Sequence, residues 1–247
     1  MKFKIHLEYD GTGYSGWQKQ KNAKSIQGTL IDAVYDIFKS SKAKNEFIDL
    51  QGSGRTDSGV HAYGQVAHLE CQTMLGPEIL KLKLNDILPS SINILDIDKA
   101  DHRFHARHSA KSREYIYRIA KRRTAFEKKY VWWVKDKLNV GKMKECAALM
   151  VGMHDYISFT DKNNPEPSTK VLVEAIDISE TPELIIIKIK ASHFLWKMVR
   201  RAVGVLAECG RGNYNHKDIT RFLNSYSEEP AAYTAPPSGL FLNKVYY

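Results

Sequence analysis

One stretch of this chain does most to set its fold: Gln51-Gly52-Ser53-Gly54-Arg55-Thr56-Asp57-Ser58-Gly59-Val60-His61-Ala62. The apolar stretches 47–50 and 65–69 flank it, and both are typical of β-strands. Glycines let the backbone turn sharply, and a loop held between strands often presents reactive groups. The loop therefore predicts a functional carboxylate, Asp57, although Asp beside Ser and Gly is also typical of a simple turn.

Composition places the chain among ordinary soluble globular proteins. Its 247 residues, 43% hydrophobic and 26% charged, suit one large domain or two intimate ones. No apolar run approaches the roughly 20 residues needed to span a bilayer. The segment 1–6 lacks a signal-peptide core and resembles an edge strand. Cys71, Cys146 and Cys209 are too scattered for a disulfide framework, which indicates a reduced, cytoplasmic protein.

Positive charge is concentrated in one segment. The net charge is +9, and residues 102–129 hold ten Lys or Arg and two Glu, which gives 10 − 2 = +8. Phe104, Tyr115, Tyr117 and Phe126 lie among these cations. Interleaved cations and aromatic rings favour a nucleic acid, through phosphate contacts and base stacking. The alternative is a solvated charged face.

Hydrophobic periodicity predicts alternating strands and helices, typical of an α/β or α+β fold. A soft boundary near residue 105 divides the chain into halves 1–105 and 106–247. The polar stretch 160–170 is predicted to be a loop. The predicted strands are 2–9, 46–51, 65–71, 92–97, 113–120, 171–179, 184–191 and 240–246. The predicted helices run from a Ser25 cap to Phe38 and over 77–88, 142–151, 195–209 and 216–225. The helix 195–209 carries Lys197, Arg200 and Arg201.

Two motifs offer competing interpretations. Residues 11–16 match G-x-G-x-x-G, but the helix begins only near Ser25, so a turn and a polar, RNA-facing loop are favoured over a dinucleotide site. His102, His105 and His108 are spaced for one helical face and could suggest a metal site. Arginines among them and the missing carboxylate cluster disfavour a divalent ion.

One loop carboxylate then remains for chemistry. A carboxylate with neither metal nor partner acid indicates nucleophilic or general-base work. The surrounding positive charge indicates an anionic polymer as substrate. A Ser–His–Asp hydrolase is disfavoured because the chain has no G-x-S-x-G elbow.

Ordered motifs occur along nearly the whole chain, in segments 8–11, 16–20, 25–27, 54–62, 104–107, 115–117, 194–201 and 239–242. Together they resemble the tRNA pseudouridine synthase A family. Ser58 stands where that family usually has alanine, and little sequence follows the last predicted strand; neither departure touches the proposed chemistry.

The resemblance implies an α+β pseudouridine synthase fold. Two ferredoxin-like α/β halves would join around a mixed, mostly antiparallel central sheet with a basic cleft. The implied activity is isomerisation of uridine to pseudouridine in the tRNA anticodon stem-loop, at positions 38 to 40, with no metal or cofactor. The resemblance also implies a homodimer.

The resemblance also implies catalytic roles for single residues. Asp57 would act in ionised form on the sugar, on the ring or on a sugar proton, and these three alternatives stay open. Arg200 would be its ion-pair partner or a phosphate contact. Tyr115 would stack on the target base, or be a core tyrosine. Arg55 would help to extrude the nucleotide, or bond loop carbonyls.

Other residues are expected to bind the substrate. Leu240 would form an apolar wall of the uracil pocket, or belong to the ordinary core. Arg107, Arg118 and Lys121 of the basic segment are expected to contact the RNA. Two other functions stay open: a non-catalytic RNA-binding protein on the same scaffold, and a metal-dependent nuclease.

Overall fold

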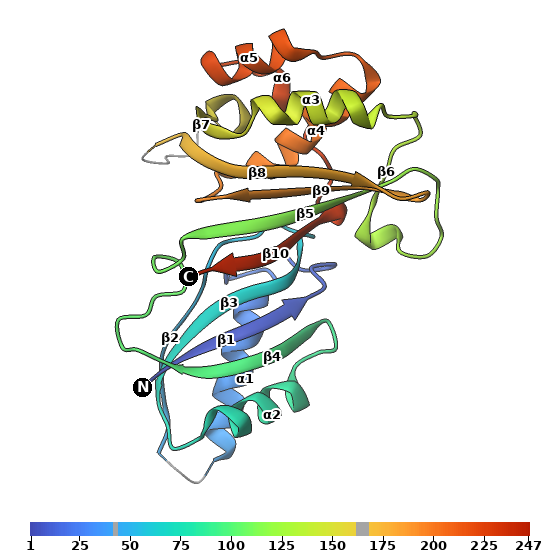
Figure 1. Cartoon of the computed structure of the whole chain (residues 1–247). Coiled ribbons are helices and arrows are strands. Elements are labelled where there is room, and N and C mark those ends of the chain that lie inside the picture. Colours follow the sequence, from blue (N-terminus) through green and yellow to red (C-terminus); the bar gives the residue numbers. More distant parts are fainter. Residues whose placement is uncertain (42–43, 162–167) are drawn as a thin grey trace. The chain divides into compact units, whose positions relative to one another are not determined.

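The structure is a computed structural model that describes residues 1–41, 44–161 and 168–247. Ten strands and six α-helices occur in these ranges, so the chain is α+β, as predicted (Figure 1). Most of the predicted loop 160–170 lies outside the described residues.

The chain forms two compact units. The first unit comprises Met1–Lys111 and Leu242–Tyr247, and the second comprises Ser112–Phe241. The first unit thus extends past the predicted boundary at residue 105 and takes in the last residues of the chain. The elements that lie wholly in the first unit are β1 (Lys2–Tyr9), α1 (Ile26–Ser40), β2 (Glu46–Gly52), β3 (His61–Gln72), α2 (Pro77–Ile87) and β4 (Ile92–Ala100).

An antiparallel sheet organises the first unit, with α1 against β2 and α2 against β4 (Figure 1). The predicted edge position of β1 is wrong. Its residue Ile5 pairs with Ala67 of β3 on one side and with Ile97 of β4 on the other, so β1 is an inner strand. The alternation of apolar and polar residues that predicted this strand indicates which face is buried. It carries no information about which strands pair with it on either side.

Helix α1 begins as the sequence predicts. The Gly28 N–H donates to the Ser25 Oγ at 3.2 Å, which satisfies one of the unpaired amides at the helix start. The predicted apolar face is buried against the sheet. It consists of Ile26, Leu30, Ala33, Val34, Ile37 and Phe38.

The second unit is a sheet with helices on one face (Figure 1). The chain enters it through the predicted strand that carries Tyr115. The elements are β5 (Ser112–Ala120), β6 (Trp132–Trp133), α3 (Val140–Leu149), β7 (Gly152–Asp155), β8 (Lys170–Glu180), β9 (Leu184–Ala191), α4 (Met198–Arg211), α5 (His216–Asn224) and α6 (Glu229–Ala232), while β10 (Leu240–Tyr246) begins in this unit and ends in the first.

The sheet of the second unit is mostly antiparallel. β5 pairs with β9, β9 with β8, and β8 with β7, all antiparallel, while the short β6 runs parallel to β5. Tyr115, Tyr117 and Ile119 are buried on one face of β5, whereas Ile116 and Arg118 are partly exposed on the other. This alternation is as predicted. The two-residue β6 and the four-residue β7 were not predicted, because strands so short leave no periodicity.

Two helices of this unit differ from the prediction at their ends. α3 starts before the predicted residue 142, because the Asn139 side chain caps it by accepting from the Lys142 N–H. α4 starts at Met198, after the predicted residue 195. Lys197 has a left-handed backbone (φ 60°) that interrupts helical hydrogen bonding, so it lies outside the helix. Arg200 lies within α4, as predicted.

Glycine 204 allows α4 to lie directly against the segment that follows α6. A Cβ at this position would lie 1.6 Å from the Tyr233 carbonyl oxygen. We expect Gly204→Ala to lower the free energy of unfolding by about 1–3 kcal/mol, because the backbone must move to relieve the clash. Urea titration measures this. Gly76→Ser, at the N-cap of α2 where a Cβ meets nothing within 4 Å, should leave the midpoint unchanged or raise it; equal effects of the two substitutions would contradict the close approach.

Candidate functional site

The loop that carries Asp57 is fixed at its start by β3. Ser53 N–H donates to the Val66 carbonyl at 2.7 Å, and its hydroxyl donates to the Gln65 Oε1 at 2.6 Å. The Gln65 amide in turn donates to the Gly54 carbonyl at 3.1 Å. Ser53 and Gln65 are fully buried, so these bonds are shielded from water. The loop is therefore held to the sheet three residues before its carboxylate.

The segment that follows β1 holds the middle of the loop. Trp17 N–H donates to the Thr56 carbonyl at 3.0 Å, and the Tyr9 hydroxyl lies 2.8 Å from the Thr56 Oγ1. The Ser58 hydroxyl donates to the Tyr14 carbonyl at 3.0 Å. We call residues 9–17 the clamp. Both neighbours of Asp57 are thus bonded to the clamp, which fixes the backbone from which this carboxylate projects.

Two glycines allow the clamp to approach the loop this closely. A Cβ on Gly11 would lie 2.1 Å from the Val60 carbonyl oxygen, and one on Gly16 would lie 2.4 Å from the Thr56 carbonyl oxygen. Gly16 also has φ +92°, which side chains rarely adopt. The helix α1 starts only at Ile26, so Gly16 opens no helix. The glycines of the G-x-G-x-x-G motif therefore serve the Asp57 loop and do not form a dinucleotide turn.

Tyr9 remains a neutral hydroxyl within the clamp. Burial raises its pKa to about 12, and the hydrogen bond to Thr56 opposes this only in part. The bond between Tyr9 and Thr56 is therefore present throughout the physiological pH range.

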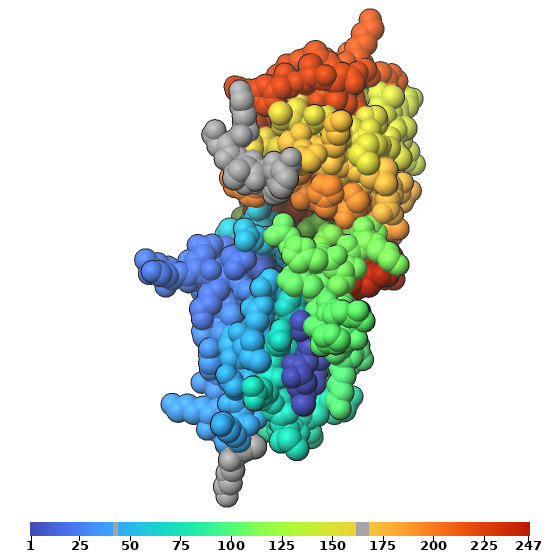
Figure 2. All heavy atoms as spheres, turned by 90° about the vertical axis from the view of Figure 1, so that its left-hand side faces the viewer, coloured from blue at the N-terminus to red at the C-terminus, as the bar shows by residue number. Residues whose placement is uncertain are grey.

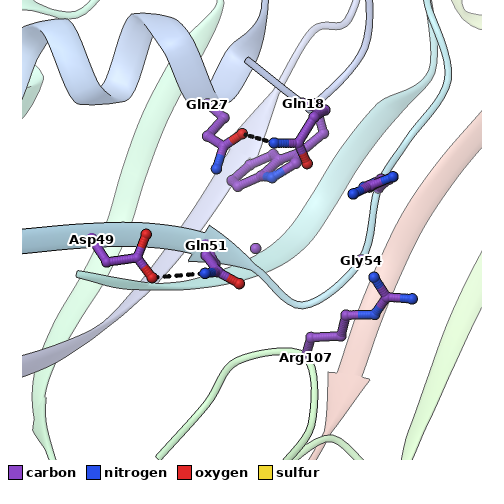
Figure 3. Close-up of a pocket in the computed structure, with 9 residues that line it drawn as sticks. Gln18, Gln27, Asp49, Gln51, Gly54 and Arg107 are labelled. Carbon is purple, nitrogen blue, oxygen red and sulfur yellow. Dashed lines mark hydrogen bonds between the residues drawn. The ribbon is translucent and has the colours of Figure 1, made fainter. Parts of the chain in front are cut away.

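A polar pocket lies beside this loop in the first unit (Figure 3). Its volume is about 310 Å³, and Arg55 of the loop and Arg107 both line it, whereas Asp57 does not. Arg55 is exposed and, among the described residues, its guanidinium makes no hydrogen bond or ion pair. The full lining is Trp17, Gln18, Gln27, Asp49, Gln51, Gly52, Gly54, Arg55 and Arg107.

The other predicted catalytic residues lie in the second unit. Tyr115 is buried on β5, with its ring edge-on to Phe194 at 5.0 Å between centroids. Arg200, on α4, donates through Nε to the Ala235 carbonyl at 2.7 Å, and the Ala235 N–H donates back to the Arg200 carbonyl at 3.0 Å. Leu240 is buried at the start of β10. Each has a defined place within this unit.

Arg200 also lies close enough to Tyr117 to influence its titration. Burial raises the pKa of the Tyr117 phenol well above its ordinary value, and the positive charge of Arg200 opposes this shift. The phenol donates to the Pro236 carbonyl at 2.7 Å. Tyr117 is therefore a structural, protonated tyrosine.

The basic segment is divided between the units. Arg107 belongs to the first, whereas Arg118 and Lys121 belong to the second. Arg118 is paired with Glu127 at 3.2 Å and Lys121 with Glu180 at 2.9 Å. These two cations therefore already have carboxylate partners, and a phosphate would compete with those partners.

The three histidines of the metal hypothesis lie in irregular turns and not on a helix. The His105 ring packs against His108 at 4.3 Å and His68 at 4.6 Å. Burial lowers the pKa of both His68 and His105, so they are neutral at pH 7. In the part of the chain that the structure describes, no group of three or more His, Cys, Asp or Glu side chains could hold a metal ion.

The sequence predicted neither a disulfide framework nor a membrane-spanning segment, and the cysteines and helices can be compared with these expectations. Cys71, Cys146 and Cys209 are free and buried. Burial raises the pKa of Cys71 to about 11, so its thiol is unreactive at pH 7. Within the described ranges, none of the helices combines the length and the apolar character that crossing a bilayer requires.

Comparison with known proteins identifies the family. The sequence profile described as tRNA pseudouridine synthase matches residues 5–109 and 146–247. The chain belongs to the tRNA pseudouridine synthase family. Its members are isomerases, and the match spans both units, including the Asp57 loop and α4.

Individual relatives match over their full length. The tRNA pseudouridine synthase A of Wolbachia pipientis wMel is 39% identical over 251 residues, covering 100% of each chain. That of Thermoanaerobacter sp. (strain X514) is 37% identical over 245 residues, 98% of each. That of Anaplasma phagocytophilum (strain HZ) is 36% identical over 252 residues, 100% of each. Among solved structures, an unknown protein from Galdieria sulphuraria aligns at a TM-score of 0.23 and 11% identity, over 85% of this chain and 92% of its own, too distant to support an argument.

Sequence reasoning missed the polar residues that line the pocket with Arg55 and Arg107. Gln27 lies in a segment that was noted only as part of the resemblance, and Gln18 lies in the polar loop that was predicted to face RNA but not to line a pocket. Asp49 and Gln51 lie on β2, where their alternation with apolar residues predicted a strand but not that they line a pocket. No spacing rule connects residues 18, 27, 49 and 107, because only the tertiary fold joins them.

The clamp predicts different costs at two of its glycines. Gly13 and Gly16 both have positive φ, but a Cβ on Gly13 meets nothing within 4 Å. We expect Gly16→Ala to lose about 1–3 kcal/mol more stability than Gly13→Ala, since it adds a clash with Thr56 to the same backbone strain. Thermal unfolding of both variants measures the difference. Equal losses would show that the contact with the loop is dispensable.

Proposed function

We propose that this chain isomerises uridine to pseudouridine in the anticodon stem-loop of tRNA, at positions 38 to 40. Membership in the tRNA pseudouridine synthase family supports the reaction. The observation that carries the proposal is the clamped loop, which presents Asp57 between the bonded residues Thr56 and Ser58. A preorganised carboxylate is what a reaction on a bound nucleotide requires.

The reaction needs no redox partner. The N1–C1′ bond of the uridine breaks, a C5–C1′ bond forms, the hydrogen on C5 leaves as a proton, and N1 takes up a proton. Electrons and atoms balance within the uracil and its sugar, so one ionised carboxylate acting as nucleophile or base is sufficient. Asp57 is the carboxylate to which we assign this role.

Arg200 and Tyr115 are proposed to assist Asp57. Arg200 would be its ion-pair partner, and the bond from the Arg200 Nε to Ala235 supports this by restraining the guanidinium. Tyr115 would stack on the target base, and its edge-on contact with Phe194 supports this by holding the ring in one orientation. Leu240 would supply an apolar wall to the uracil pocket.

Arg55 is proposed to displace the target nucleotide. A base in a stem must leave its stack before chemistry, at a cost of a few kcal/mol. The exposure of Arg55 supports this role, because its guanidinium could enter the vacated space without first breaking a hydrogen bond to the described residues. Arg107, Arg118 and Lys121 are proposed to bind the tRNA backbone. We also propose that the chain forms a homodimer, which rests on the resemblance, and that it works in the cytoplasm, which rests on the free cysteines.

The central prediction is that Asp57→Ala loses pseudouridine formation while retaining tRNA binding. We expect turnover to fall by on the order of 10⁴-fold or more, as for loss of a catalytic nucleophile. Tritium release from tRNA labelled at uracil C5 measures it, because C5 loses its hydrogen in the reaction. Asp36→Ala is the matched control: it removes an exposed carboxylate of α1, far in sequence from the loop, and should retain turnover.

Each outcome of this assay has one meaning. Turnover of Asp57→Ala near that of the wild type would refute the mechanism. Binding of tRNA by the wild type without tritium release would establish a non-catalytic RNA-binding protein. Cleavage of the tRNA that a chelator abolishes would establish a nuclease.

A second prediction concerns the basic segment. Replacing Arg118, Lys121 and Arg122 together by glutamine should weaken tRNA binding and lower the slope of log K against log salt by up to about 2–3. The control replaces three exposed lysines of α3 and α5, Lys142, Lys144 and Lys217, and should change the slope less. Filter binding at several salt concentrations measures both slopes. If the triple variant and the control variant have the same slope, the charge of residues 118–122 does not bind tRNA phosphates.

A further inference from the structure

Chain segments far apart in sequence meet in the polar pocket beside Arg55. The pocket joins the end of the clamp, the start of α1, the strand β2, the Asp57 loop and the turn that carries Arg107. On the face of the first unit in Figure 2, the segments around residue 50 (light blue) and around residue 107 (green) both reach the surface. Asp57 does not line the pocket, so the target uridine, which Asp57 must reach, is not its occupant.

A buried glutamine orients one wall of the pocket. Gln27 is 6% exposed, and its Oε1 accepts from the Gln18 Nε2 and from the Lys19 N–H, both at 2.8 Å. Its own amide donates to the Leu50 carbonyl at 2.7 Å. Because the Gln18 amide nitrogen is engaged with Gln27, the Gln18 oxygen is left as a hydrogen-bond acceptor (Figure 3).

A carboxylate on β2 forms a second acceptor wall. The Gln51 Nε2 donates to the Asp49 Oδ2 at 2.8 Å (Figure 3). The Ala106 N–H donates to the His68 Nδ1, so the ring proton of neutral His68 is on Nε2, which lies 3.6 Å from the same Asp49 oxygen. Asp49 is thus held through Oδ2, and both Oδ1 and the Gln51 oxygen remain acceptors.

Cations and an aromatic floor complete the pocket. In Figure 3, Arg107 approaches from the side opposite Gln18 and Gln27. Arg55 adds a second guanidinium to the lining. Trp17 packs directly against the backbone of Gly52, where a Cβ would lie 2.5 Å from its indole ring, so a flat apolar surface forms part of the lining.

We propose that this pocket binds a second nucleotide of the RNA, adjacent to the target, whose base carries an amino group. The guanidinium group of Arg107 suits its phosphate, while Arg55 stays available to displace the target base. The acceptors on Gln18, Asp49 and Gln51 suit the exocyclic amine of cytosine, adenine or guanine, whereas uracil offers a single N–H donor. A volume of about 310 Å³ is at the lower end of the range for small-ligand sites.

The inference rests on the proposed function, since it takes RNA as the partner. It adds a selection step to that function: the enzyme would recognise a neighbour of the uridine that it isomerises. Asp49 and Gln18 would then determine specificity without touching the reacting atoms.

Cytidine 5′-monophosphate and uridine 5′-monophosphate are the probes, because they differ only at the base edge. We expect the full-length wild-type protein to bind CMP about tenfold more tightly than UMP, the effect of one added hydrogen bond to a charged group. Asp49→Ala should abolish this preference, and Gln18→Ala should reduce it. Arg107→Ala should weaken both nucleotides alike. Ligand-observed NMR titration measures the affinities, and thermal unfolding verifies that each variant is folded.

Equal affinity for CMP and UMP, no binding of either, or a preference that survives in both Asp49→Ala and Gln18→Ala would overturn the proposal. Arg103→Ala is the control for charge: it removes an exposed arginine of the same segment that does not line the pocket, and should leave both affinities unchanged.

Turnover of tRNA separates this inference from the proposed function. In the tritium-release assay, Asp49→Ala and Arg107→Ala should raise KM several-fold with kcat near that of the wild type, unlike Asp57→Ala. A wild-type protein that releases no tritium would refute the proposed function. A wild type that releases tritium, together with a KM in Asp49→Ala equal to that in Arg103→Ala, would refute the pocket alone.

Discussion

The hydrogen bond from the Trp17 N–H to the Thr56 carbonyl is the contact on which the first unit's functional surface depends. The same Gly16–Trp17 dipeptide also uses its carbonyls to accept from the Ile26 and Gln27 N–H groups, at 3.1 and 2.9 Å. Amides at the start of a helix have no partner within it, so these bonds fix where α1 begins. Two residues thus connect the Asp57 loop to the N-terminus of α1, and the Trp17 ring connects both to β2 through Gly52.

This arrangement makes the Asp57 loop costly to move. Leaving a buried donor or acceptor unpaired costs about 1–3 kcal/mol, and a shift of the loop would break the bonds of the buried Ser53 and Thr56 together. The glycines contribute because they have no side chain: a Cβ on Gly11 or Gly16 would overlap a backbone carbonyl of the loop. A glycine motif that resembles a dinucleotide site in sequence therefore serves to let residues 9–17 approach the Asp57 loop closely.

Features that depend on local sequence could be predicted, and features that depend on distant segments could not. The face of α1, its Ser25 cap and the alternation around Tyr115 follow from neighbours within a few residues, and the structure confirms them. The inner position of β1 follows from its pairing with β3 and β4, about which its own eight residues carry no information. The start of α4 depends on one left-handed residue, Lys197, which is neither glycine nor asparagine and gives no signal. For the same reason Asp57 stood out from its own loop, whereas Gln27 became visible only as a buried amide bonded to Gln18 and Leu50.

The basic segment shows why net charge is a poor count of RNA contacts. Its ten cations and two carboxylates give 10 − 2 = +8, as if the charge formed one surface. In the folded chain, Arg118 and Lys121 each face a carboxylate, and one of these, Glu180, comes from β8, outside the segment. A phosphate that binds Arg118 or Lys121 replaces part of an existing ion pair, so the net gain is smaller than for a solvated cation. Arg55 differs because it has no such partner among the described residues. The backbone of its loop is also held in place by hydrogen bonds to residues 9–17. The cations best suited to bind an RNA strand are therefore those that have no carboxylate partner in the folded chain. The density of Lys and Arg in the sequence does not identify them.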